Sequence, residues 1–160
     1  MRNFSPAKRG FTMIEILVVV TIIGILITLG IRSYNATQIK ARDVRRKADL
    51  HNMAKPLEAY FNDYGVYPLD DDAGQIVDDV GHSMVWGAEA FDDSNGTVYM
   101  SQLPEDPRGD RDYWYVSADG SEWALYALLE NENDPDIAGP FDGTACQTAV
   151  KCTFQVTSTN

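Results

Sequence analysis

A single carboxylate interrupts the most apolar stretch of the chain. From Phe11 to Ile31 the sequence runs 21 residues with one ionisable side chain, Glu15. A charged side chain inside a membrane helix costs on the order of 2.5–3.5 kcal/mol, so it needs a partner or a function. Cleavage after Gly10 would place a new α-amine on Phe11, and this amine could pair with Glu15 of the same chain or of a neighbour. A second possibility is that Glu15 lies near enough to the helix end to reach the membrane interface.

The two cysteines, Cys146 and Cys152, are separated by six positions near the C-terminus. An even count and close spacing predict a disulfide in an exported protein, whereas in a cytoplasmic protein both thiols would stay reduced. A metal site at these cysteines is disfavoured, because the only histidines, His51 and His82, lie far away in the sequence.

Motifs for catalysis are missing from the sequence. It contains no phosphate-binding loop, no zinc-ligand spacing and no nucleophile elbow, and neither histidine has an evident acid–base partner. The sequence therefore predicts a protein that is not an enzyme and has no catalytic residues.

One long helix is expected to position the N-terminal residues. The segment 11–31 is long and apolar enough to cross a membrane, and no proline follows before Pro56. We predict a helix over 11–63, with 32–63 as an amphipathic stem. Pro56 is expected to bend it. Gly24 and Gly30 weaken it locally, either to allow melting in an assembly or to allow close helix packing.

The amphipathic stem carries an apolar stripe that should seat a sheet. The stripe has spacings of three and four and comprises Leu50, Met53, Ala54, Leu57, Tyr60, Phe61 and Tyr64. The opposite side is expected to hold most of a polar set: Arg42, Arg45, Arg46, Asp49, Asn52 and Lys55.

Beyond Gly65 and Pro68, which should stop the helix, the sequence changes character. Residues 69–96 have few regular signals and predict a long connection, in which Val85, Trp86 and Phe91 pack a turn or short helix on the core. The runs 113–116 and 122–128 predict a β-hairpin with Asp119-Gly120 at its tip. A third strand is expected over 149–156, which gives an antiparallel sheet of three or four strands.

The stretch Gly10-Phe11-Thr12-Met13-Ile14-Glu15, with its basic leader and apolar continuation, resembles the class III signal of type IV pilins and type II secretion pseudopilins. All five elements of that signal are present: leader, Gly, Phe, Glu and apolar helix. A weaker resemblance, at Leu57–Phe61 and Tyr64–Pro68, is to the helix end of G-type pseudopilins and small pilins. The resemblance implies an α+β pilin-like fold with a leader at 1–10, a long helix at 11–63 and a globular head at 64–160.

The resemblance also implies a function and a set of partners. Leader cleavage after Gly10 by a prepilin peptidase would be followed by N-methylation of Phe11. The subunits would leave the cytoplasmic membrane to form an extracellular, helical homopolymer, with Glu15 and Phe11 acting in assembly. Further expected partners are minor pilins, an assembly platform protein and an ATPase.

No cofactor is required by this reading, although G-type pseudopilins bind calcium in loops near the sheet. Calcium prefers six to eight oxygen ligands. Two acidic clusters are candidates, and neither has the spacing of a dedicated loop motif: Asp106, Asp110 and Asp112, and Asp134, Asp136 and Asp142. The alternative is a solvated acidic surface.

Charge is distributed very unevenly along the chain. Residues 1–55 hold ten Lys and Arg against three acidic residues, a net +7, whereas residues 56–160 hold three against 21, a net −18. So acidic a head is not expected to bind nucleic acid. Basic stems could instead attract acidic heads of neighbouring subunits.

Three interpretations follow. A major pilin is favoured by the complete signal and the cysteine pair, and a secretion pseudopilin by the Tyr64–Pro68 segment and a compact sheet. A non-polymerising, single-pass anchored binding protein is the alternative of another class. It is the one that fits the basic residues after the apolar run, which by the positive-inside rule would keep the C-terminal part in the cytoplasm.

Overall fold

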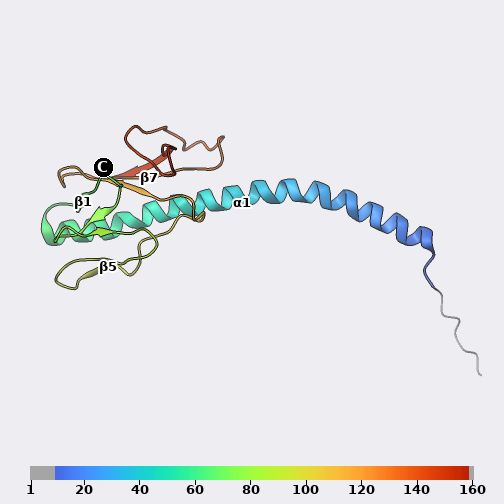
Figure 1. The fold of residues 1–160 in the computed structure, drawn as a ribbon, viewed down its shortest axis with the longest axis horizontal. Coiled ribbons are helices and arrows are strands. Elements are labelled where there is room, and N and C mark those ends of the chain that lie inside the picture. The colour runs from blue at the N-terminus through green and yellow to red at the C-terminus, as the bar shows by residue number, and fades with distance from the viewer. Residues whose placement is uncertain (1–9, 159–160) are drawn as a thin grey trace, which may run out of the picture. The chain divides into compact units, whose positions relative to one another are not determined.

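The computed structural model describes residues 10–158, apart from the side chains of residues 29, 30 and 32. Its fold is α+β: helix α1 (Met13–Tyr64) precedes all of the strands (Figure 1). Contacts divide the chain between Gln38 and Ile39 into two units, and the first consists largely of the first half of α1. The predicted leader, residues 1–10, lies outside the described residues except for Gly10.

Helix α1 confirms the predicted long helix with small differences at its ends. It spans 52 residues, begins two residues after Phe11 and includes Gly24, Gly30 and Pro56 without a break. It stops at Gly65, whose φ of 73° is the left-handed conformation common after a helix end and whose N–H donates to the carbonyl of Phe61 at 2.7 Å. Melting at the glycines in an assembly and bending at Pro56 remain predictions.

The apolar stripe of α1 packs as predicted. Leu50, Met53 and Leu57 are fully buried and Tyr60 is 4% exposed. On the opposite side Arg45 and Lys55 are exposed. Arg46 contradicts the prediction, because it has no exposed surface. Its charge placed it with the solvated residues, although it lies four and seven positions before Leu50 and Met53 and so shares their side of the helix. The carboxylates of Asp43, Asp106 and Glu130 surround it there.

The C-terminal sheet has the order β6-β7-β8, with β6 (Trp114–Val116), β7 (Ala124–Ala127) and β8 (Phe154–Thr157) all antiparallel. The predicted hairpin and third strand are therefore confirmed. The third strand starts five residues later than expected, since the disulfide loop occupies the preceding residues. In Figure 1, β7 lies on the opposite side of α1 from β5.

Residues 69–100 are not the irregular connection that the sequence predicted. They form five short strands: β1 (Leu69–Asp70), β2 (Ile76–Val77), β3 (Ser83–Met84), β4 (Phe91–Asp92) and β5 (Val98–Met100). The first three make one antiparallel sheet and the last two a separate hairpin. The prediction was wrong because strands of two or three residues are too short to show an alternating pattern.

Three copies of one turn organise these strands. Asp71, Asp78 and Asp93 each accept backbone N–H bonds, at 2.7–3.0 Å, from residues two and four positions further on. The residue three positions after each aspartate is a glycine with φ between 73° and 89°. An aspartate that bonds its own turn and a glycine at positive φ are the residues that tight hairpins need. The D-x-x-G spacing was therefore a local signal for these hairpins.

One hydrophobic core joins α1 to the strands. Trp86 and Phe91 are buried in it as predicted, whereas Val85 is 45% exposed. Each fully buried large side chain contributes about 1.5–3 kcal/mol. The core also includes Tyr67, Ile76, Met84, Leu103, Tyr113, Tyr115, Trp123, Leu125, Ala127, Leu129 and Phe154. The aromatic residues of the predicted strands are thus mostly core residues, as expected.

Candidate assembly site

The N-terminal end of α1 is closed by a reciprocal pair of hydrogen bonds. The backbone N–H of Glu15 donates to Thr12 Oγ1 at 3.3 Å, and the backbone N–H of Thr12 donates to Glu15 Oε2 at 3.4 Å. This is a capping box, in which two helix N–H groups without helical partners are satisfied. Thr12 was not singled out from the sequence, although Thr12-Met13-Ile14-Glu15 fits the T-x-x-E pattern that predicts it.

The capping box holds the carboxylate of Glu15 against Thr12, the second residue after the predicted cleavage site. Gly10 and Phe11 are both exposed, and the Phe11 side chain is 79% exposed. A carboxylate can accept several hydrogen bonds, so the bond to Thr12 leaves Glu15 able to bind an ammonium group. A negative side chain in the first turn is also favoured by the helix dipole.

The first half of α1 exposes its apolar side chains on all sides. Leu17 is 61% exposed, Val20 57% and Leu26 62%. Within the described residues α1 is the one helix long and apolar enough to cross a membrane, with a mean hydropathy of 2.8 over its most apolar window. Such a surface requires lipid or other apolar helices, since no part of residues 10–158 covers it.

In the head, the buried guanidinium of Arg46 connects α1 to two loops. Its Nε and Nη2 donate to the two carboxylate oxygens of Asp106, at 2.6 and 2.7 Å. Its Nη1 donates to Asp43 at 2.7 Å and to Glu130 at 2.8 Å. Asp43 in turn accepts the backbone N–H groups of Glu130 and Asn131, both at 2.9 Å. We refer to Asp43, Arg46, Asp106 and Glu130 as the Arg46 cluster.

Charges in the Arg46 cluster are stabilised by their partners. The hydrogen bond from Arg42 is the main cause that lowers the pKa of Glu130 to about 2, in spite of burial, which raises it. Burial alone would lower the pKa of Arg46, but its bonds to Asp106, Glu130 and Asp43 raise it above its ordinary value. Arg46 and Glu130 are therefore both ionised at neutral pH.

The basic residues after the membrane run are only partly free. Arg42 forms a two-bond pair with Glu130, at 2.7 and 2.6 Å, and Lys47 binds Asp134 and Asp136 at 2.5 and 2.6 Å. Six Lys and Arg residues lie between positions 32 and 47, just after the apolar run, and they underlie the argument from the positive-inside rule. Arg42, Arg46 and Lys47 are three of these six. They are matched by carboxylates of their own head, which limits the predicted stem-to-head attraction between subunits to the remaining cations.

The calcium candidates do not come together as a metal site. Among residues 10–158, no group of three or more His, Cys, Asp or Glu side chains is placed to hold a metal ion. Instead a cation of the same chain contacts most of the candidate carboxylates. Arg46 binds Asp106, Arg108 binds Asp110, Lys47 binds Asp134 and Asp136, and Lys151 binds Asp142. Asp112 is exposed.

Cys146 and Cys152 form the predicted disulfide, with both residues fully buried. The bridge packs beside Leu128, with Trp114, Tyr126 and Phe141 against it, and makes a small second core. His82 lies 3.9 Å from Asp78 and 3.8 Å from Glu89, beyond hydrogen-bond distance. His51 is on the exposed side of α1.

Together these features define a class of protein: a head that packs on the second half of a long helix, whose first half is a bare apolar rod with a capped carboxylate at its start. The chain matches the family described as "Prokaryotic N-terminal methylation motif" over residues 5–31. That match includes the predicted cleavage site, Glu15 and the apolar rod.

Known proteins extend the similarity into the head. The chain is 28% identical to the type II secretion system core protein G of Escherichia coli (strain K12), over 88% of this chain and 92% of that protein. It is 31% identical to the core protein G of Vibrio cholerae serotype O1, over 69% and 71%. It is 33% identical to the type IV major pilin protein PilA of Myxococcus xanthus (strain DK1622), over 41% and 30%. No solved structure matches the chain significantly.

The chain therefore belongs to the family of type IV pilins and type II secretion pseudopilins. The relatives imply a subunit of a filament built from identical copies. The apolar rod and its N-terminal motif fit a precursor that is anchored in a membrane before assembly.

Proposed function

We propose that this chain is the main structural subunit of a type II secretion pseudopilus and has no catalytic activity. One observation carries the choice within the family. The similarity to protein G covers 88% of the chain, including the head, whereas the similarity to the pilin PilA covers 41%. The sequence alone favoured a pilin, on the complete N-terminal signal and the cysteine pair. The signal is common to both classes, so it does not decide between them.

The proposed life cycle follows from the N-terminal geometry. A prepilin peptidase cuts after the exposed Gly10 and methylates the new amine of Phe11. The methylated amine still carries a positive charge, and Glu15 of a neighbouring subunit neutralises it. This contact sets the register between two apolar rods. An assembly platform protein and an ATPase supply the work of extraction, because lipid already covers the rods as well as neighbouring helices do. Minor pilins are further proposed partners.

A major pilin of a surface pilus is the second candidate. The disulfide loop at the C-terminus and the match to PilA favour it. The anchored, non-polymerising binding protein is the third, and it differs from both because it would not need Glu15.

Deletion of the gene in its native cell, with complementation by the wild type or by Glu15→Gln, tests the three candidates. For a pseudopilus, deletion abolishes the release of specific proteins into the medium and leaves surface filaments in place. The Glu15→Gln variant fails to restore release. Loss of surface filaments with unchanged release would instead indicate a pilus. Full complementation by Glu15→Gln would indicate an anchored protein.

A further inference from the structure

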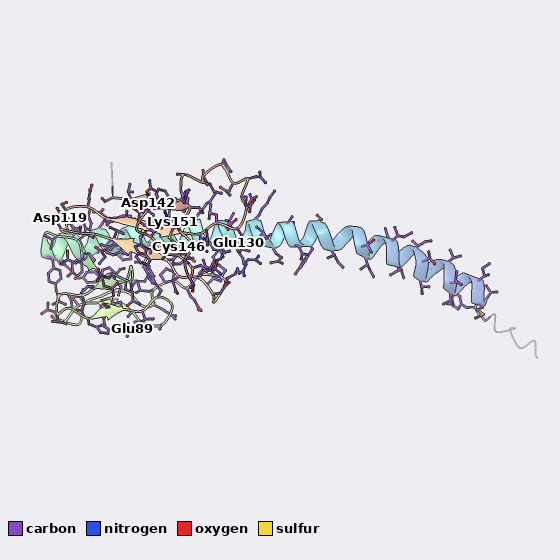
Figure 2. All side chains as sticks on the ribbon, turned by 45° about the horizontal axis from the view of Figure 1, so that its top comes forward. Glu89, Asp119, Glu130, Asp142, Cys146 and Lys151 are labelled. Atoms are coloured by element: carbon purple, nitrogen blue, oxygen red, sulfur yellow. A yellow bond between two sulfur atoms is a disulfide. The ribbon has the colours of Figure 1, made fainter. Side chains whose placement is uncertain are left out.

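One segment of the head has many carboxylates and no Lys or Arg to pair with them. The segment 56–107 contains twelve acidic residues and no Lys or Arg. Of these twelve, Asp106 is the one that pairs with a Lys or Arg among residues 10–158. Figure 2 shows Asp119, a further acidic residue, at the end of the head where α1 finishes, and Glu130 of the Arg46 cluster toward the other end. Among the described residues, Arg42 and Arg46 thus pair with carboxylates near Glu130, whereas the carboxylates of 56–105 have no Lys or Arg partner.

A groove lies at this acidic end of the head. We refer to it as the tip groove and define it by Tyr64, Val66, Leu69, Asp78, Asp79 and Asp119, which line a cavity of about 640 Å³. Val66 and Leu69 are each 49% exposed. The carboxylate of Asp79 is held in place by the backbone N–H of Ser94 at 2.9 Å. Apolar and aromatic walls with fixed carboxylates suit a side chain with an aliphatic stem and a positive end.

The same chain offers a complementary surface on α1. We refer to it as the cationic helix face and define it by Lys40, Ala41, Val44, Arg45 and Ala48, which are all exposed. Their spacing places them on one side of the helix. Val44 is 66% exposed and the Arg45 side chain 63%. Unlike Arg42, Arg46 and Lys47, which bind carboxylates of the head, Lys40 has no ion pair within the described residues, and Arg45 has only a long contact of 3.7 Å to Asp49.

We infer that the cationic helix face of one subunit docks in the tip groove of a second copy. The inference rests on the proposed function, because it concerns contacts between identical subunits of a filament. Val44 would lie on Val66 and Leu69, with Lys40 and Arg45 directed at the carboxylates of Asp79 and Asp119. Both surfaces belong to the second unit, so no contact with the apolar rod is required.

The geometry of this contact favours an open filament over a closed dimer. The two surfaces differ, and a contact between unlike surfaces propagates from copy to copy unless the rotation happens to close a ring. Twenty residues separate Val44 from Tyr64 along α1, so docked copies would be displaced by roughly 30 Å along the helix axis. That displacement would fix how far neighbouring copies are shifted along the helix axis, independently of Glu15.

A cysteine pair in the assembled protein tests the contact directly. The wild-type chain has no free cysteine, and Val44 and Leu69 are both exposed enough to be replaced without loss of packing. In one copy Val44 lies roughly 30 Å along α1 from Tyr64, and Leu69 lines the groove together with Tyr64, so a bridge between Val44→Cys and Leu69→Cys must join two copies. Filaments of full-length Val44→Cys/Leu69→Cys, oxidised in the native cell, are expected to give a ladder of cross-linked multimers on a non-reducing gel. The matched control is Val44→Cys/Val150→Cys, since Val150 is 42% exposed and lies outside the groove.

Charge reversal in the cysteine background then tests the chemistry. Lys40→Glu with Arg45→Glu is expected to reduce the ladder about tenfold, because like charges would face each other. Lys151→Glu, which reverses a cation outside the helix face, should leave the ladder unchanged.

An equal ladder in both cysteine pairs, or no ladder in filaments that form normally, would overturn the inference and leave the proposed function intact. A ladder that vanishes on chelation and is insensitive to charge reversal would assign the groove to a divalent cation, and it would also overturn the inference. Absence of filaments in the wild type would remove the proposed function and this contact together.

Discussion

At the scale of single residues, Arg46 bears most of the electrostatic organisation of the head. It replaces what would otherwise be repulsion among Asp43, Asp106 and Glu130 with four short hydrogen bonds. A buried ion cluster of this kind need not be more stabilising than an apolar core. Removing one partner is nevertheless costly, since it leaves uncompensated buried charge.

We predict that Arg46→Ala lowers the free energy of unfolding by about 3–5 kcal/mol. The carboxylate of Asp106 would keep its buried position with no guanidinium to pair with. Urea unfolding of the full chain in detergent measures the change. Arg45→Ala, one residue away and exposed, is the control and should stay within about 0.5 kcal/mol of wild type. Equal effects of the two variants would show that the Arg46 cluster is not a structural hub.

A second residue-scale prediction concerns Glu130 and acid. The pKa of Glu130 is lowered to about 2 by its bonds to Arg42 and Arg46. A carboxyl group with a lowered folded-state pKa contributes stability above its unfolded pKa of about 4.3, and that stability is lost as pH falls toward 2. We therefore expect Glu130→Gln to be less stable than wild type at pH 7 by roughly 2–3 kcal/mol, and the difference to shrink steadily between pH 5 and about 2.

Urea titrations of both proteins across that pH range measure this difference. Other carboxylates also lose stability in acid, notably Asp134, whose pKa is lowered by its bond to Lys47. They act equally in both proteins and cancel in the comparison. A stability difference that did not depend on pH would mean that Glu130 acts through packing rather than through its charge.

At the scale of elements, the sequence predicted what is encoded locally. Helix α1 and strands β6 and β7 arise from apolar or aromatic runs and were predicted close to their observed positions, whereas β8 starts five residues later than predicted. The burial of Arg46 follows from its spacing to Leu50 and Met53. Its partners Asp106 and Glu130 could not be predicted, because they are 60 and 84 positions away in the sequence. The hairpins of residues 69–100 were missed for a different reason. Their strands are too short for periodicity, and only the repeated D-x-x-G turns reveal them.

The disulfide is expected to stabilise the C-terminal loop to a limited extent. Closing so short a loop is worth roughly 2–3 kcal/mol in chain entropy. We predict a loss of that size for Cys146→Ser/Cys152→Ser, measured by the same urea unfolding, with β6, β7 and the head fold retained. Trp114 and Tyr126 pack against the bridge, so the loop loses these contacts when the bridge is removed. We therefore expect amide hydrogen exchange to become faster in this loop. Complete unfolding of the head would contradict the prediction and show that the bridge is needed to form the sheet.

Calcium is the subject of the other element-scale prediction. Because cations of the chain itself occupy five of the six candidate carboxylates, we predict that excess chelator leaves the melting temperature of the full chain unchanged. Differential scanning fluorimetry with and without added calcium makes the comparison. A rise of several degrees with calcium would contradict it, because it would require these ion pairs to open and the loops to rearrange around a metal.

At the scale of the whole molecule, the chain consists of an apolar unit and an acidic unit. The first half of α1 is an apolar rod that needs lipid or other rods, and its one carboxylate sits in a capping box at the N-terminus. The head is acidic, and its residues Arg42, Arg46 and Lys47 pair with its own carboxylates. In the proposed function, membrane anchoring, processing and polymerisation therefore all depend on the N-terminal residues.

Mass spectrometry of the intact protein, purified from its native cell, tests this account most directly. The account predicts a chain that begins at Phe11, heavier than the bare sequence by about 14 Da for one methyl group and lighter by about 2 Da for the Cys146–Cys152 bridge. Both changes in one molecule would establish processing at the membrane and export of the head. A chain that still begins at Met1, with two free thiols, would contradict the account and leave a head retained in the cytoplasm on a permanent anchor.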